Sequence, residues 1–304
     1  MARTETSGRR ARVSRGGAAA PTVRAARRAA RWAVQAYTRP TAGLRMLPGF
    51  LIIGAQRAGT TSLHRYLVQH PAVGTMLRTK GVHFFDTSYG RGIAWYASRF
   101  PTRAYGWWVR RRTGTGLLCG EASPYYLFHP LVPARVAEHL PEVKLIALLR
   151  DPVQRAYSHH QHELARGFET LPFEQAIERE PQRLAGQVER LLAEPLSVSF
   201  AHQHHSYLAR GLYADQLAAW WARVPAERLL VLSSERFFAD PAATFARVLD
   251  FLELPAFTPD AYERHNAHSY ARMDEALRRR LAAYYEEPNR RLFAALGDDL
   301  GWSS

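Results

Sequence analysis

The chain has 304 residues, 47% of them hydrophobic and 22% charged, which is enough apolar material for one substantial core. Its formal net charge is +14, but residues 1–49 contain eleven arginines and one acid, so residues 50–304 carry only +4. That small excess does not indicate a nucleic-acid surface, and a single cysteine, Cys119, excludes intramolecular disulfides and a cysteine-rich metal cluster.

The N-terminal region, residues 1–47, is predicted to be a basic arm outside the core. Residues 1–20 are rich in Arg, Gly, Ser and Ala, a composition that predicts disorder. Within residues 24–37, four arginines recur at helical spacing. We favour a solvated helical arm, and the alternative is a peripheral helix that contacts anionic lipid at the inner face of a membrane. The chain shows neither the apolar core of a signal peptide nor an apolar run of membrane-spanning length, which predicts a cytoplasmic protein.

Residues 48–304 are predicted to form one α/β domain. Three short apolar runs are typical of buried parallel strands: Phe50–Ile53, Lys144–Leu149 and Leu229–Leu232. Helical patterns and boundary residues predict helices at 60–69, 152–166, 207–221, 241–251 and 275–293. Strands that alternate with helices indicate a central parallel sheet flanked by helices.

The segment Gly54–Ser62, with the sequence GAQRAGTTS, joins the first predicted strand to the next helix. Its glycines let backbone amides approach a ligand, and the helix N-terminus adds free N–H groups and a positive dipole end. Arg57 adds a fixed charge, so the segment predicts an anion cradle. The glycine spacing is that of a P-loop, but Thr60 stands where a nucleotide-hydrolysing P-loop has Lys.

A second motif, LLRDPVQRAYS, occupies residues 148–158. Arg150 ends a predicted strand, which is where open α/β sheets bind ligands, and Ser158 lies two turns into the following helix. An arginine and a hydroxyl can together hold one phosphate group. The alternative is that Arg150 forms an ion pair with Asp151.

Both motifs resemble those of the sulfotransferases that use 3′-phosphoadenosine 5′-phosphosulfate (PAPS). The first resembles the 5′-phosphosulfate loop and the second the 3′-phosphate motif of that family, in particular of the bacterial group related to heparan sulfate N- and O-sulfotransferases. The resemblance covers residues 47–302 and implies a P-loop-like three-layer fold, with PAPS as co-substrate, released as 3′-phosphoadenosine 5′-phosphate (PAP), and no metal. The donor-binding residues that it implies are Gln56, Arg57, Ala58, Gly59, Thr60, Thr61, Ser62, Arg150, Ser158, Ser269 and Tyr270.

The segment KGVHFFD at residues 80–86 resembles the family segment KExHFFD, whose Glu is the proposed general base. Gly81 takes its place here. His83 is the best substitute, because neutral imidazole accepts a proton near pH 7, although a purely structural histidine is an equal alternative. Glu121 is a second candidate base or orients the acceptor. Lys80 is a candidate for binding the sulfonate, and Arg57, where the family usually has Lys, for stabilising the leaving oxygen.

The predicted activity is transfer of a sulfuryl group from PAPS to a hydroxyl or amine of a carbohydrate or small-molecule acceptor. Two alternatives stay open: a PAP-binding protein impaired by the loss of Glu at Gly81, and a P-loop kinase. Histidines 202, 204 and 205 are poorly spaced for a metal site. The aromatic residues expected near the acceptor are Tyr125, Tyr126, Phe128, Trp107 and Trp108.

Overall fold

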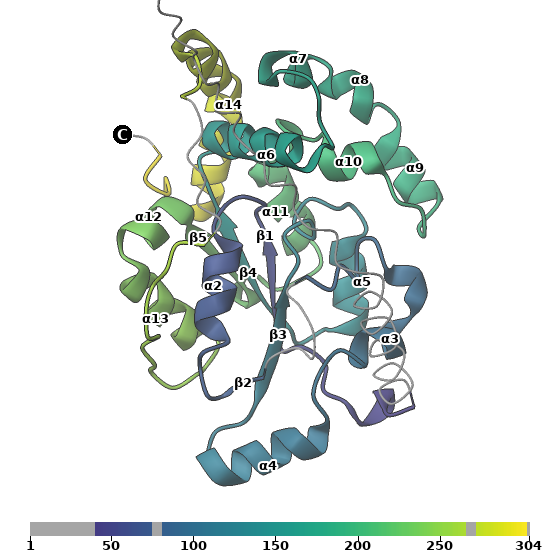
Figure 1. Ribbon diagram of the computed structural model, residues 1–304, viewed down its shortest axis with the longest axis vertical. Helices are drawn as coiled ribbons and strands as arrows, with labels where there is room; N and C mark the ends of the chain where they lie inside the picture. The colour runs from purple at the N-terminus through teal and green to yellow at the C-terminus, as the bar shows by residue number, and fades with distance from the viewer. Residues whose placement is uncertain (1–39, 75–80, 266–271, 303–304) are drawn as a thin grey trace, which may run out of the picture.

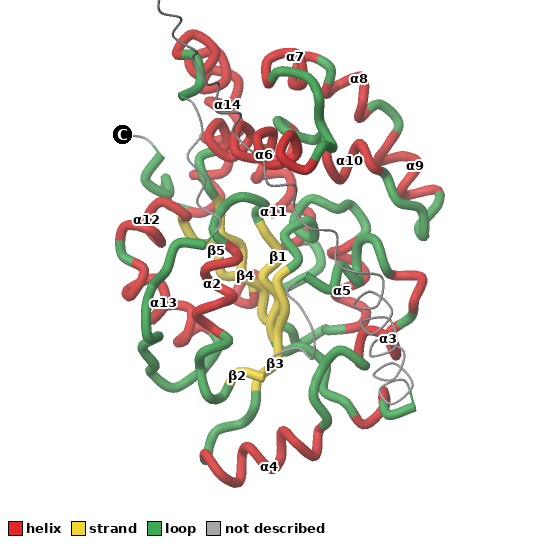
Figure 2. The backbone as a smooth tube through the Cα atoms, viewed as in Figure 1, coloured by secondary structure: helices red, strands yellow, loops and turns green. Residues whose placement is uncertain are grey.

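The structure, a computed structural model, describes residues 40–74, 81–265 and 272–302. Its centre is a sheet of five parallel strands in the order β2-β3-β1-β4-β5 (Figures 1 and 2). The strands are β1 (Phe50–Gly54), β2 (Val73–Gly74), β3 (Leu118–Ala122), β4 (Lys144–Leu149) and β5 (Leu229–Ser233). The predicted arm helix at residues 24–37 lies outside the described residues.

Helices cover both faces of the sheet, which gives the predicted three-layer, P-loop-like α/β fold. Nine of the described helices are α2 (Thr60–Leu67), α3 (Ile93–Ala97), α4 (Arg103–Thr113), α5 (Val132–His139), α6 (Pro152–Arg166), α11 (Tyr213–Trp221), α12 (Ser234–Ala239), α13 (Pro241–Phe251) and α14 (Glu275–Leu296). Four short ones, α7 (Phe173–Glu178), α8 (Glu180–Leu184), α9 (Gln187–Ala193) and α10 (Phe200–His204), lie together above the sheet in Figure 1. The 3₁₀ turns are 42–44, 89–91, 209–211 and 226–228.

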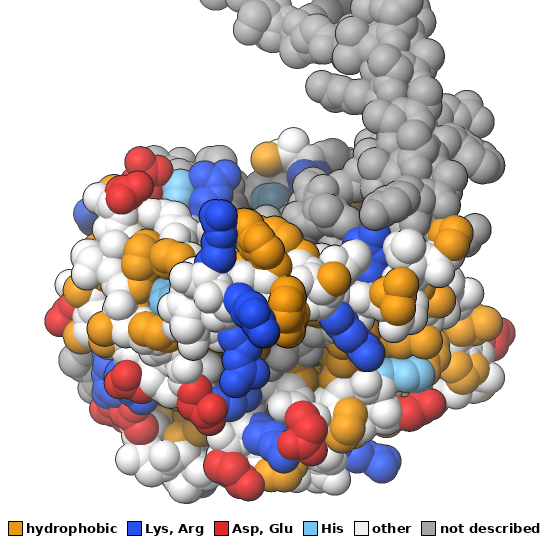
Figure 3. Space-filling view, turned by 90° about the horizontal axis from the view of Figure 1, so that it is seen from below, with side chains coloured by type: hydrophobic (Ala, Val, Ile, Leu, Met, Phe, Trp, Pro, Cys, Tyr) orange, Lys and Arg blue, Asp and Glu red, His pale blue; other side chains and the backbone are white. Residues whose placement is uncertain are grey.

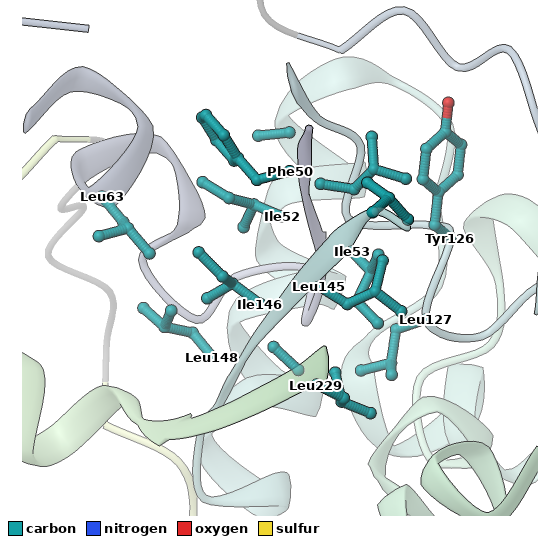
Figure 4. Close-up of a cluster of buried hydrophobic side chains, with 14 of the residues drawn as sticks. Phe50, Ile52, Ile53, Leu63, Tyr126, Leu127, Leu145, Ile146, Leu148 and Leu229 are labelled. Carbon is teal, nitrogen blue, oxygen red and sulfur yellow. The ribbon is translucent and has the colours of Figure 1, made fainter. Parts of the chain in front are cut away.

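The core forms around β1, which lies between β3 and β4 and is buried along its whole length. Ile52 of β1 and Ile146 of β4 lie toward Leu63 of α2, whereas Ile53 lies toward Leu127 on the other side (Figure 4). Burial on both faces explains why β1 and β4 read as continuous apolar runs instead of alternating ones. Strands of this kind fix the position of the loops that leave their carboxyl ends.

Several predicted elements are confirmed, and α6 is the clearest of them. It spans Pro152–Arg166 as predicted, because both ends are capped: the Asp151 side chain accepts a hydrogen bond from the Gln154 amide at 2.8 Å, and Gly167 adopts a φ of 73°. No helix among the described residues is both long enough and apolar enough to cross a membrane.

The prediction of one helix over residues 207–221 is wrong at its start. Residues 209–211 form a 3₁₀ turn, and α11 begins only at Tyr213. The cause is a tertiary contact, since the buried Glu180 carboxylate of α8 accepts hydrogen bonds from the amides of Leu208 at 2.6 Å and Ala209 at 2.8 Å. A carboxylate that is distant in sequence therefore sets the local backbone.

Candidate active site

The loop between β1 and α2 has the shape that the sequence predicts for an anion cradle. Gly59 caps α2 with a φ of 98°, and a Cβ atom there would lie 2.8 Å from the ring of Phe238, so only glycine fits. Arg57 also adopts a left-handed conformation, with a φ of 72°. Such strained backbone is concentrated at functional sites. The hydroxyl-bearing Thr60 and Ser62 follow, buried in the first turn of α2.

The two predicted nucleotide motifs meet at the carboxyl ends of β1 and β4. Arg57 Nε donates a hydrogen bond to Ser158 Oγ at 3.1 Å. Arg150 donates to the Arg57 carbonyl oxygen at 3.2 Å and to Gln154 Oε1 at 3.2 Å. The two motifs, which lie about ninety residues apart in sequence, thus form one cluster at the ligand-binding edge of the sheet.

A cavity of about 480 Å³ opens beside this cluster, next to the start of α14. It is lined by Arg150, Val153, Gln154, Tyr157, Ser158, Arg272, Met273, Glu275 and Arg278. Burial lowers the pKa of Arg150 from its usual value, which reflects the cost of holding the cation out of water. Sequence reasoning missed Arg272 and Arg278, although the run of three arginines at 278–280 near the start of the last predicted helix was a visible signal. Three arginines around one cavity fit a ligand rich in phosphate.

His83 lies beside the carboxyl end of β3 and is held by two contacts. Its amide donates to Ser123 Oγ at 3.1 Å, and its Nδ1 lies 2.7 Å from Oδ2 of the buried Asp86. Burial lowers the pKa of His83, but the hydrogen bond and the negative charge of Asp86 raise it by more, so the pKa lies above 6.5. Asp86, which the sequence analysis did not assign, orients the ring and leaves Nε2 to accept a proton.

Gly81 lies against the His83 ring. Its φ is 79°, and a Cβ atom at this position would lie 3.3 Å from His83 Nε2 and 3.4 Å from the carbonyl oxygen of Ala122. The space next to residue 81, where the related segment carries its glutamate, is therefore taken by the imidazole. This arrangement favours His83 as the proton acceptor over a purely structural histidine.

Glu121 is fully buried within β3, and four groups donate hydrogen bonds to it. They are Tyr96 OH at 2.8 Å, Tyr126 OH at 2.9 Å, the Val82 amide at 2.8 Å and Ser123 Oγ at 2.8 Å. Burial raises its pKa, and these hydrogen bonds oppose that effect. Because four donors already use its oxygens, the Glu121 carboxylate holds the backbone just before His83. These contacts favour a role in orienting the site over a role as the base.

Gln56, in the loop after β1, is held from two sides. Its Oε1 accepts a hydrogen bond from Arg210, and its Nε2 lies 3.4 Å from Oε1 of the buried Glu163 in α6. Burial lowers the pKa of Arg210 to about 10. A buried network thus joins the anion cradle to α6, and its members Glu163 and Arg210 were not foreseen from the sequence.

The three histidines near residue 204 have separate partners. His202 Nδ1 lies 2.6 Å from Tyr125 OH, His204 Nδ1 lies 3.1 Å from Glu163 Oε2, and His205 Nε2 lies 2.9 Å from the Phe168 carbonyl oxygen. In the part of the chain that the structure describes, no group of three or more side chains is arranged to hold a metal ion.

Some predicted site residues are not near the cluster or cannot be placed. Lys80, Ser269 and Tyr270 lie outside the described residues. Trp107 and Trp108, expected near the acceptor, instead lie on α4, which precedes β3 and lies at the edge of the sheet opposite α6 (Figure 1). That expectation is wrong. The sequence analysis did not recognise β3 as a strand, so it could not show that the helix before β3 lies where the strands begin and not where they end.

A loop with P-loop glycine spacing, an arginine-lined cavity and a paired histidine lie at the carboxyl ends of one parallel sheet, which indicates an enzyme that acts on a phosphate-bearing ligand. Residues 47–286 match the family described as the sulfotransferase domain, so the chain belongs to that family and is a sulfotransferase.

Known relatives and a solved structure agree with this assignment. The chain is 30% identical over 289 residues to human heparan sulfate glucosamine 3-O-sulfotransferase 6, covering 86% of this chain and 75% of that protein. It is 32% identical over 219 residues to human bifunctional heparan sulfate N-deacetylase/N-sulfotransferase 2, covering 69% of this chain but 22% of that protein. The crystal structure of a sulfotransferase from Alicyclobacillus acidocaldarius superposes with a TM-score of 0.61 at 27% identity, covering 83% of this chain and 97% of that one.

Proposed function

We propose that the chain transfers the sulfuryl group of PAPS to a hydroxyl or amine of a carbohydrate acceptor or a related small molecule. The observation that carries the proposal is the cluster of Arg57, Ser158 and Arg150 beside the arginine-lined cavity. The carbohydrate acceptor is supported by the heparan sulfate enzymes among the relatives.

The donor end of the site is assigned to the two nucleotide motifs. Arg150, Ser158 and Arg278 would hold the 3′-phosphate side of PAPS, and the loop from Gln56 to Ser62 would hold the 5′-phosphosulfate. PAPS supplies the sulfuryl group and leaves as PAP. Arg57 would stabilise the negative charge that develops on the departing phosphate oxygen. Because its guanidinium stays protonated, it acts through charge and not by proton donation.

The acceptor end of the site is assigned to His83. Asp86 takes the hydrogen bond of Nδ1, so Nε2 is the nitrogen that removes the proton from the acceptor hydroxyl as its oxygen bonds to sulfur. A base of this kind contributes about 10²–10⁴-fold to a rate. The presence of this pair argues against the impaired-enzyme alternative, and Thr60 in place of the P-loop Lys argues against a kinase. Lys80, Ser269 and Tyr270 stay predictions, as do the cytoplasmic location and the lipid contact of the N-terminal arm.

The donor assignment is tested by calorimetry with PAP and with AMP, which lacks the 3′-phosphate. We expect the protein to prefer PAP, and Arg150→Ala to weaken PAP binding by roughly 10- to 100-fold while AMP binding changes little. The exposed Arg223→Ala is the matched control and should leave both affinities unchanged. A wild-type protein that binds PAP and AMP equally contradicts the assignment.

The catalytic assignment is tested with radiolabelled PAPS and a panel of sugar, phenol and lipid acceptors in the presence of EDTA. We expect label on a carbohydrate hydroxyl or amine, and a loss of at least about 100-fold in His83→Ala. PAP affinity should be unchanged in that variant, which separates loss of the base from loss of the donor site. Undiminished turnover in His83→Ala removes His83 from the mechanism.

A further inference from the structure

Helix α4 exposes a surface that the sulfotransferase reaction does not use. Of its residues, only Gly106 and Val109 are buried, and its exposed aromatic side chains are Tyr105, Trp107 and Trp108, with exposed fractions of 49%, 59% and 45%. Large apolar side chains that gather on a surface mark an interaction site, whereas single ones need no explanation.

The residues just before the core extend this surface. The Met46 amide donates to the Pro101 carbonyl oxygen at 2.9 Å, and Met46 Sδ lies 2.9 Å from where a Cβ atom of Gly106 would be. This contact places the segment that carries Leu44 and Leu47, which are 66% and 37% exposed, beside α4. We call the α4 patch the set Leu44, Leu47, Arg103, Tyr105, Trp107, Trp108, Arg110, Arg111 and Arg112.

The α4 patch is strongly cationic. Between Asp86 and Glu121 the sequence contains six arginines and no acidic residue, and four of the six lie in the patch. Arg111 stacks over the Trp107 ring at 4.6 Å and Arg112 over the Trp108 ring at 4.6 Å. Seen from the side on which α4 lies, Figure 3 shows basic side chains flanked by hydrophobic ones. Charge and aromatic surface are therefore presented together.

The chemistry of the patch selects one class of partner. The four arginines of the patch would repel their counterparts across a symmetric dimer of this chain. A nucleic acid or a sulfated polysaccharide would satisfy the arginines but would gain little from Leu44 and Leu47. An anionic membrane surface satisfies both, because Trp and Tyr prefer the headgroup level, arginine is attracted to acidic lipids and leucine gains from the acyl boundary.

We propose that the α4 patch docks the enzyme on an anionic lipid surface. The patch lies at the amino ends of the strands, and the donor cavity lies at their carboxyl ends (Figure 1). Docking through α4 therefore leaves the donor cavity away from the membrane. The patch includes none of residues 24–37, the segment for which a lipid-binding helix is the alternative prediction, and the proposal goes beyond the proposed function.

The test measures binding of the full chain to vesicles that contain 30% phosphatidylglycerol in phosphatidylcholine. Arg111→Glu/Arg112→Glu and Trp107→Ser/Trp108→Ser should each lower the partition coefficient by at least about tenfold. The matched control is Arg223→Glu/Arg247→Glu, which makes the same charge change at exposed positions outside the patch and should change binding by less than about twofold. PAP affinity and thermal unfolding verify that each variant is folded.

A second measurement distinguishes lipid contact from attraction to any polyanion. Bromine-labelled acyl chains should quench the tryptophan fluorescence of the wild type, and Trp107→Phe/Trp108→Phe should lose most of that quenching. If the α4 variants bind vesicles like the wild type, the proposal is overturned. It is equally overturned if bromolipids quench both proteins alike, or if the patch binds soluble heparin or DNA and shows no quenching by lipid.

Discussion

The pair of His83 and Asp86 lies next to the position at which the motif is altered. The segment that resembles KExHFFD has lost its carboxylate at Gly81, yet the imidazole lies against that position and Asp86 holds its Nδ1 at 2.7 Å. A histidine paired with a buried carboxylate is an oriented base with a raised pKa. In the proposed mechanism, position 81 therefore contributes space, and His83 accepts the proton.

The first prediction concerns the pKa of His83. Because Asp86 raises it, Asp86→Asn should lower it toward or below 6.5 by removing the negative charge. An NMR titration of the imidazole signals, assigned with His83→Gln, measures the pKa in both proteins without an acceptor. Since the base must be neutral, the acidic limb of kcat/KM should move to lower pH by the same amount. An unchanged His83 pKa in Asp86→Asn would show that the pair does not control the base.

The second prediction concerns Gly81. Gly81→Ala should cost about 1–2 kcal/mol of unfolding free energy, because φ is 79°, and should also displace the His83 ring, which lies 3.3 Å from the new Cβ atom. Gly114→Ala is the matched control, since φ is 73° there and no atom lies within 4 Å of its Cβ position. Urea unfolding should show similar losses, and only Gly81→Ala should shift the His83 NMR signal. A shift in both variants, or in neither, contradicts the contact.

For individual residues, the sequence identified the candidates, but it did not show which of them acts as the base and which one orients the site. His83 and Glu121 were both candidate bases, and only the structure shows that Glu121 receives four hydrogen bonds. Asp86 lies three residues from His83 and is visible in the motif, yet its contact depends on the left-handed backbone of His83, with a φ of 50°. The hydrogen bond from Arg210 to Gln56 joins residues that are more than 150 positions apart in the sequence, so no local sequence pattern reveals it.

Among the secondary-structure elements, the capped helix α6 is the one that organises the site. Arg150 just before the helix and Ser158 two turns into it line the cavity, and Glu163 near its C-terminal end contacts Gln56 and His204. The sequence predicts α6 well because proline, the aspartate cap and the terminal glycine are all local signals. In contrast, β3 was not predicted, because the strand LCGEA contains Gly120 beneath the Phe50 ring and the buried Glu121.

The third prediction concerns the contact between α8 and the turn before α11. Burial raises the pKa of Glu180 from 4.5 to about 7. The folded state therefore keeps a proton that the unfolded state loses between these values, so the Glu180 contribution to the unfolding free energy falls as pH rises through this window. The difference in unfolding free energy between wild type and Glu180→Gln should fall by up to about 3 kcal/mol between pH 4.5 and 7.

Urea unfolding at several pH values checks this effect, and taking the difference between two proteins cancels most other titrating groups. The matched control is Glu189→Gln on α9, where the side chain is exposed. The difference in unfolding free energy between the wild type and Glu189→Gln should not change with pH over the same range. A flat difference for Glu180→Gln as well would show that the buried carboxylate does not hold its proton.

At the scale of the whole molecule, the arginine-lined cavity and the cluster beside it join segments that are far apart in sequence. Arg57 follows β1, Arg150 follows β4 and Arg278 lies in the first turn of α14, so these cations meet only once the chain has folded. The parallel sheet could be predicted because its central strands are apolar throughout. The contribution of α14 could not, since helical periodicity does not show where the last helix packs.

The fourth prediction follows from this arrangement, because a ligand that binds only the folded chain stabilises all of it. PAP at a free concentration of 100 times its Kd should raise the unfolding free energy by about 2.7 kcal/mol. Arg278→Ala should weaken PAP binding and lose about 1.4 kcal/mol of that gain for each tenfold rise in Kd.

The control for Arg278 lies on the same helix. Arg278 pairs with Glu275 at 2.7 Å, and Arg290 pairs with Glu287 at the same i, i+3 spacing, but only Arg278 lines the cavity. Exposed pairs of this kind contribute little to stability, so both alanine variants should unfold like the wild type without ligand. Urea unfolding with PAP should then separate them, with Arg290→Ala stabilised like the wild type and Arg278→Ala less. Equal stabilisation of the two variants would remove α14 from the proposed donor site and leave that site to Arg57, Arg150 and Ser158.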